Sequence, residues 1–169
     1  MRRKTLDKTT ILLYNSSMQT HLAIIKPKSL AKILAGSKTI ESRFAIHRPP
    51  AWQTEAGDAI YFKVTGGDIL CQAIVTAVDR YHLAFPGDLL YLEPKYWRGV
   101  HGSSRNIAYW SSAINRGVQY AVFVHLAEVT QLLIPASTLD KRLPYASAWI
   151  LNFIPPTITQ SQMFSAPHR

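Results

Sequence analysis

The 169-residue sequence contains a single cysteine, Cys71, which excludes a disulfide within the chain. Cys71 lies inside a strand-like run without a neighbouring cation or histidine, so we expect a small buried hydrophobic residue rather than a reactive thiol. Histidine and acidic residues also lack the spacing of a metal site, and we expect neither a metal nor another cofactor. No apolar run approaches the roughly 18 residues that span a bilayer. The sequence therefore predicts a soluble cytoplasmic protein with no membrane partner.

Glycine-rich nucleotide signatures are also missing, since neither GxGxxG nor GxxxxGK[ST] occurs. Acidic residues are few, with 10 Asp and Glu against 19 Lys and Arg, for a net charge of +9. Residues 21–48 carry six Lys and Arg against only Glu41, whereas the 121 residues from 49 onward have a net charge of +1. A basic region confined in this way is typical of a phosphate-binding face, but solvated Lys and Arg on a helix give the same composition.

Apolar residues alternate with polar ones in several short segments, which predicts β-strands. The expected strands cover residues 21–25, 39–44, 59–64, 69–78, 120–133 and 147–153. In the fourth of these, the alternation places Cys71, Ala73, Val75 and Ala77 on one face.

Helical spacing of apolar residues occurs in two regions. Pro27 suits the first turn of a helix, and Gly36 is placed to end it. Residues 79–118 form a helical insertion, in which a turn starting at Pro86 is expected to stop at Pro94 and a second helix covers 106–115. The fold class is therefore α+β, a small barrel of mixed strands with one early helix and a helical insertion.

We expect one folded domain, at residues 21–153. A flexible basic leader, residues 1–20, precedes it. A disordered tail, residues 154–169, follows it, because this segment is rich in Pro, Thr, Gln and Ser and has little periodicity.

The densest group of reactive side chains is Gly36-Ser37-Lys38-Thr39-Ile40-Glu41-Ser42-Arg43, directly after the early helix. On a strand, Glu41 and Arg43 share one face. Two interpretations remain open. Glu41 and Arg43 could form an ion pair that only orders the mouth of the barrel. Alternatively, Glu41 could accept hydrogen bonds from a base amine or a ribose hydroxyl while Lys38 and Arg43 hold a phosphate.

The order strand, Lys-Pro, helix, Gly36-x-Lys38-x-x-Glu41-x-Arg43, strand resembles the ASCH family (activating-signal-cointegrator homology domains) of the PUA-like superfamily. The resemblance covers about residues 21–153 and includes the turn at Gly57-Asp58. It implies a PUA-like pseudo-β-barrel that binds RNA or a nucleotide-like ligand in a cleft beside the motif.

For such a partner we expect binding through a set of basic, acidic and aromatic side chains. These are Lys26, Lys28, Lys38, Glu41, Arg43, Arg48 and Trp52. Tyr96, Trp97, Tyr109 and Trp110 are further candidates for stacking on bases, although aromatic residues at helical spacing usually face a core.

Three alternatives to nucleic-acid binding remain. Some small ASCH proteins are amidohydrolases acting on acylated cytidine, and the resemblance then makes Lys38 and Glu41 the catalytic candidates, with Glu93 as a distant acid. Those enzymes carry threonine where this chain has Glu41. Ribonuclease activity also occurs in the family, and the available general acids or bases are His47, His82, His101 and His125. The third alternative is a non-catalytic adaptor that binds a protein partner.

Overall fold

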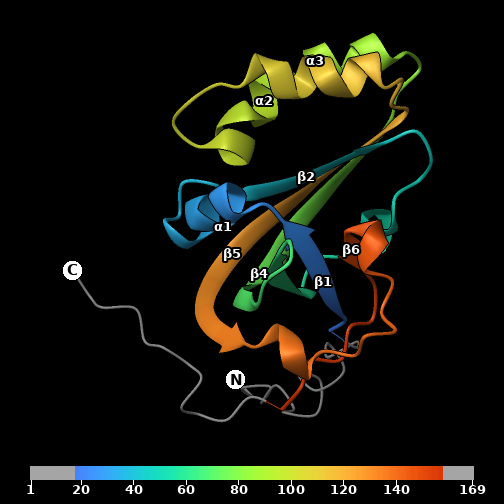
Figure 1. Cartoon of the computed structure of the whole chain (residues 1–169). Helices are drawn as coiled ribbons and strands as arrows, with labels where there is room; N and C mark the ends of the chain where they lie inside the picture. Colours follow the sequence, from blue (N-terminus) through green and yellow to red (C-terminus); the bar gives the residue numbers. More distant parts are fainter. Residues whose placement is uncertain (1–17, 158–169) are drawn as a thin grey trace, which may run out of the picture.

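The computed structural model describes residues 18–157, in which six strands form one curled sheet, a half-barrel (Figure 1). The strands are β1 (Thr20–Ile25), β2 (Ile40–Ala45), β3 (Ala59–Val64), β4 (Ile69–His82), β5 (Tyr120–Ile134) and β6 (Trp149–Ile150). Their order in the sheet is β2-β5-β4-β3-β1-β6. Strands β1 and β3 run parallel, and every other neighbouring pair is antiparallel. The expected α+β fold with a barrel of mixed strands is confirmed.

Three helices accompany the sheet in the described residues. They are α1 (Pro27–Leu34), α2 (Leu89–His101) and α3 (Ile107–Asn115). Helix α1 begins at Pro27, a position where a backbone N–H would have no partner within the helix, so the lack of this group in proline costs nothing. The chain leaves the helix through Gly36, which has a φ of +73°. Its buried residues Leu30 and Ile33 join the core inside the curled sheet. Helices α2 and α3 lie together above β2 in Figure 1.

Alternation along β5 directs neighbouring residues to two of the three hydrophobic cores in the described residues. In β5, Val122 and Val124 face the interior of the half-barrel, whereas Phe123 points outward to α2 and α3. The outer core is aromatic, with Tyr96 of α2 stacked on Phe123 at a centroid distance of 3.8 Å. Helix α2 also approaches β2 closely, because a Cβ atom placed on Gly99 would lie 2.4 Å from Cδ1 of Ile40. Glycine is therefore required at the point where α2 crosses the start of β2.

Three expectations about single elements were wrong. The alternation in β4 stops at a register shift between Val75 and Ala77, which leaves Ala77 exposed. Pro94 does not end a helix but lies inside α2. Burial of Tyr96 and Val100 stabilises this helix by more than the loss of one backbone hydrogen bond at Pro94 destabilises it. The last strand is only Trp149–Ile150, because the preceding residues form the turn η5 (Tyr145–Ser147).

Other boundaries agree within a few residues. Strand β3 matches its expected range, and β4 continues to His82, four residues beyond the predicted end. Cys71 is fully buried, as expected, and burial raises the pKa of its thiol to about 12. Strand β1 begins at Thr20, inside the segment expected to be a leader. Residues 1–17 and 158–169, which make up most of the expected leader and tail, lie outside the described residues.

Candidate functional site

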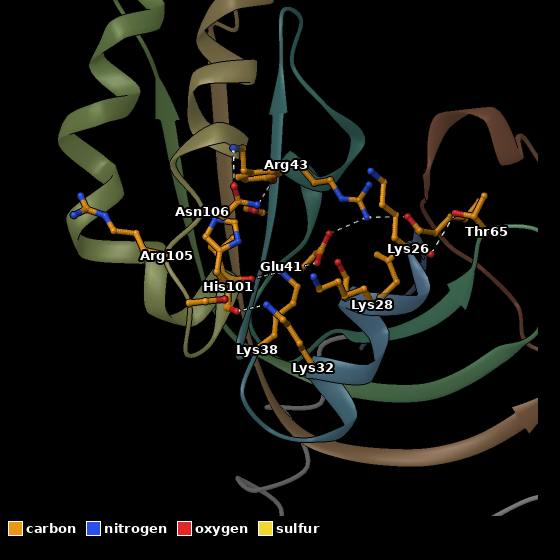
Figure 2. Close-up of a pocket in the computed structure, with 17 residues that line it drawn as sticks. Lys26, Lys28, Lys32, Lys38, Glu41, Arg43, Thr65, His101, Arg105 and Asn106 are labelled. Atoms are coloured by element: carbon orange, nitrogen blue, oxygen red, sulfur yellow. Dashed lines mark hydrogen bonds and ion pairs between the residues drawn. The ribbon is translucent and has the colours of Figure 1, made fainter.

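A cavity of about 690 Å³ opens where α1, β2 and the connection between α2 and α3 meet (Figure 2). Its walls combine basic, hydroxyl and amide side chains. The lining residues are Ile24, Ile25, Lys26, Lys28, Ser29, Lys32, Lys38, Glu41, Ser42, Arg43, Thr65, Val100, His101, Ser104, Arg105, Asn106 and Tyr109. Figure 2 shows Lys26 and Thr65 at one end and Arg105 at the other, with Glu41 between them.

Lys38, Glu41 and Arg43 form a connected group at the centre of the cavity. The buried Lys38 donates from Nζ to the carbonyl oxygens of Ile40 at 2.8 Å and Val100 at 3.0 Å, and its Nζ lies 3.2 Å from Oε2 of Glu41. These three acceptors match the three hydrogens of the ammonium group. The other carboxylate oxygen of Glu41 pairs with Arg43 at 3.0 Å. Lys38 therefore joins the start of β2 to the end of α2.

Arg43 connects the two edges of the curled sheet. Its NH2 group donates to the carbonyl oxygen of Ile24 in β1 at 3.3 Å, and its guanidinium carbon lies 5.2 Å from the ring centre of Trp149 in β6. Because β2 is one edge of the sheet and β6 the other, this side chain bridges the opening of the half-barrel. The ion pair between Glu41 and Arg43 that the sequence suggested is present, and it orders this opening.

Lysines of α1 supply positive charge along one wall. Lys26 and Lys28 are exposed, and no ion pair or side-chain hydrogen bond links either of them to another described residue. Lys32 donates from Nζ to the carbonyl oxygen of His101 at 2.5 Å, which joins α1 to the end of α2. The first turn of α1 contains no acidic residue. Its positive helix end and these lysines therefore favour an anion at this wall.

His101 forms part of the opposite wall and is neutral at physiological pH. The indole N–H of Trp110 donates to Nε2 of His101 at 3.1 Å, which requires an unprotonated Nε2. Burial of the ring and the charges of Lys38 and Lys32 lower the pKa of His101 to about 4, against the opposing effect of Glu93.

Two hydroxyl groups meet beside His101. Ser42 Oγ and Tyr109 OH lie 2.8 Å apart, and burial raises the pKa of Tyr109 to about 12. Asn106 caps the N-terminus of α3, where its side-chain oxygen accepts the backbone N–H of Tyr109 at 3.2 Å. This bond leaves the amide NH₂ of Asn106, a hydrogen-bond donor, at the cavity wall.

The cavity contains most, but not all, of the residues expected at the site. Lys26, Lys28, Lys38, Glu41 and Arg43 line it. Arg48 and Trp52 do not, and instead contact each other, with the guanidinium carbon 5.5 Å from the ring centre. Among the stacking candidates, only Tyr109 lines the cavity. Tyr96 and Trp110 are buried in the outer core, and Trp97 lines a separate pocket.

Only some of the candidate catalytic residues line the cavity. Glu93 does not line the cavity and forms a bidentate ion pair with Arg105. The hydrogen bonds from Arg105 lower the pKa of Glu93, although burial of the Glu93 carboxylate acts in the opposite direction. Of the four histidines considered, only His101 lines the cavity. His125 instead contacts Asp79, with Nε2 2.9 Å from a carboxylate oxygen.

Sequence reasoning missed several lining residues. Lys32 could have been found, because it follows Lys28 by four residues and therefore lies on the same face of α1. Ser42, Ser104 and Asn106 carry no comparable signal, since only the packing of α2 and α3 against β2 brings them to the cavity.

Metal-site clusters and membrane-spanning helices are both absent from the described residues. Between residues 18 and 157, no three His, Cys, Asp or Glu side chains are grouped as a metal site would require. No helix in this part of the chain has the length and apolar character of a membrane span.

Neither a family model nor a curated protein matches the sequence. Solved structures do match. The ASCH protein from Zymomonas mobilis superposes with a TM-score of 0.57 at 18% identity, covering 86% of this chain and 92% of that chain. Two mutant forms of the same bacterial protein each give a TM-score of 0.56 at 19% identity. They cover 86% and 85% of this chain and 92% of their own chains.

Proposed function

With the fold of an ASCH domain as the premise, we propose that this protein binds single-stranded nucleic acid, preferably RNA, and holds one nucleotide in the cavity beside Lys38, Glu41 and Arg43. The observation that carries the proposal is the charge of the cavity wall. Its lining includes six Lys and Arg residues and a single carboxylate, Glu41. A concave site with this excess of cations suits a phosphorylated ligand.

The phosphate belongs at the wall formed by α1. Lys26 and Lys28 are exposed there and free of protein partners among the described residues, so they can contact a phosphate without breaking an existing ion pair. The N-terminal end of α1 adds the partial positive charge of its backbone N–H groups. Lys38 is a weaker candidate for direct phosphate contact, because its three hydrogens are already donated within the protein.

The opposite wall suits a base or sugar. Asn106 offers an amide NH₂, Tyr109 and Ser42 offer hydroxyl groups, and each oxygen of Glu41 keeps a second lone pair. Such groups read the edges of an unpaired base or a ribose 2′-hydroxyl. This mixture of donors and acceptors favours a nucleotide over a simple phosphate ion.

The geometry of Lys38 favours binding over proton transfer. Nζ of Lys38 already contacts three acceptors of the protein, so Lys38 in this arrangement positions Glu41 rather than reaching a proton of a ligand. Glu93 is committed to Arg105, away from the cavity lining. No contact in the cavity specifically favours an amidohydrolase or a ribonuclease.

Fluorescence anisotropy with a labelled uridine hexamer tests the proposal. If two phosphates are contacted, a slope of about −0.7 per phosphate predicts about sevenfold weaker binding at 200 mM than at 50 mM salt. Replacing both lysines, Lys26→Ala with Lys28→Ala, should weaken binding and flatten this salt dependence. Arg48→Ala is the matched control, because it removes a cation of the same basic segment that does not line the cavity.

Two results would contradict nucleotide binding in the cavity. The first is an affinity that does not change with salt. The second is an equal loss of affinity in Arg48→Ala and in the double lysine variant, since this would place the contact outside the cavity. If the wild-type protein does not bind RNA but does bind a protein partner, this result would favour the non-catalytic adaptor.

A further inference from the structure

A second, smaller groove of about 330 Å³ adjoins the cavity. Its lining residues are Ile24, Lys63, Thr65, Gly66, Ala136, Leu139, Lys141 and Tyr145. Ile24 and Thr65 line both spaces, so the groove begins where the cavity ends. Thr65 lies at that end of the cavity beside Lys26, away from Asn106 and His101 (Figure 2).

The groove combines an aromatic ring with cations and has no acidic lining residue. Tyr145 is held in place by its hydroxyl group, which donates to the carbonyl oxygen of Asp140 at 2.7 Å. Lys63 donates from Nζ to the carbonyl oxygen of Gly67 at 2.5 Å and lies 5.8 Å from the centre of the Tyr145 ring. Lys141 is exposed, and no ion pair joins it to another described residue.

The neighbouring Arg142 is also exposed but has different contacts. Arg142 is paired with Asp140 through a carboxylate contact of 2.8 Å and does not line the groove. Two adjacent cations of the same loop therefore have different surroundings. Lys141 is available to a ligand of the groove, whereas Arg142 is bound within its own turn.

We propose that this groove holds a second nucleotide, adjacent in sequence to the one in the cavity. The base of the second nucleotide packs against Tyr145 and the apolar side chains of Ile24 and Leu139. The connecting phosphate passes over Thr65, with Lys26 on the cavity side and Lys141 on the groove side. An aromatic ring beside a cationic track is the arrangement that binds successive bases of a single strand.

This inference rests on the proposed function, and it narrows the ligand to a single strand of at least two nucleotides. A peptide is less suited to the same groove, because the groove continues into a cavity dominated by Lys and Arg. A duplex is also less suited, since its paired bases are stacked and cannot lie against Tyr145.

Calorimetric titration with uridine 5′-monophosphate and with the 5′-phosphorylated uridine dinucleotide tests the second subsite. Stacking of one additional base predicts between about 5-fold and 150-fold tighter binding of the dinucleotide. Tyr145→Leu should remove most of this gain and leave the affinity for the mononucleotide unchanged. Lys141→Ala should reduce the salt dependence of dinucleotide binding, whereas Arg142→Ala should preserve it.

The outcomes distinguish this inference from the function on which it rests. Equal affinity for the mononucleotide and the dinucleotide would overturn the second subsite and leave binding in the cavity intact. Failure of both compounds to bind would overturn both proposals. Lys141 is exposed, so its substitution tests the groove even if Tyr145→Leu lowers stability. Equal effects of Lys141→Ala and Arg142→Ala would assign the salt dependence to general charge and would also overturn the subsite.

Discussion

Protonation of His101 should control the stability of the cavity at acidic pH. The buried ring accepts a hydrogen bond from Trp110 and lies near the charges of Lys38 and Lys32. Below pH 4 the ring must take up a proton that breaks this bond and adds a third cation. We expect His101→Gln to remove the effect, because the glutamine side-chain oxygen can accept the indole N–H without titrating.

The size of the effect follows from the pKa of His101 in the two states. Its pKa is 6.5 in the unfolded chain and about 4 in the folded protein. Between these values the unfolded chain binds the proton and the folded protein does not, so the free energy of unfolding falls as the pH decreases. The slope approaches about 1.4 kcal/mol per pH unit. From pH 7 to pH 4.5 the loss due to His101 is therefore about 2 kcal/mol.

Urea denaturation of both proteins between pH 7.5 and pH 4.5 measures this loss. Intrinsic tryptophan fluorescence, to which Trp110 contributes, follows the unfolding. Other groups titrate in the same range, so the decisive quantity is the difference between the wild-type protein and His101→Gln. That difference should shift by about 2 kcal/mol toward the variant as the pH falls from 7 to 4.5. A difference that stays constant with pH would refute the assigned protonation state of His101.

Two substitutions test the junctions around the cavity, with the free energy of unfolding as the measurement. Gly99→Ala should destabilise the protein by about 1–3 kcal/mol, because its Cβ would overlap the buried Ile40 side chain; unchanged stability would show that α2 does not press on β2 here. Arg43→Met should cost at least about 2 kcal/mol by leaving the buried Glu41 with one partner. Arg43→Lys keeps a cation beside Glu41 and should lose less stability than Arg43→Met, and an equal loss in the two variants would contradict the assigned pairing.

Local patterns predicted the strands near the site better than the contacts between distant segments. The strand expected over residues 39–44 correctly placed Glu41 and Arg43 on one face, because the alternation of side chains in a strand depends on neighbouring residues alone. Pro94 was misjudged for the opposite reason. A proline disfavours an isolated helix, but Tyr96 and Val100 bury against the sheet and stabilise α2 through contacts with residues far along the chain.

In the candidate site, too, the residues near the motif were predicted, whereas those placed by contacts between distant segments were not. Lys26, Lys28 and Lys38 were predicted because they belong to the basic segment 21–48 that contains the motif. Arg48 was included by the same reasoning, yet the chain turns at Pro49 and takes it to Trp52 instead of the cavity. The distant wall, with Asn106 and Tyr109, depends on how the helical insertion folds back over β2, and no local pattern encodes that contact.

The arrangement of Lys38, Glu41 and Arg43 explains why these residues indicate a fold more clearly than a reaction. Lys38 joins β2 to α2, and Arg43 joins β2 to β1 and β6, so both side chains hold together segments that the sheet alone leaves apart. Glu41 lies between these two side chains and pairs with both in a largely buried position. Because these groups are paired with one another, we expect ligand preference to depend on exposed side chains at the rim of the cavity, such as Lys26 and Lys28.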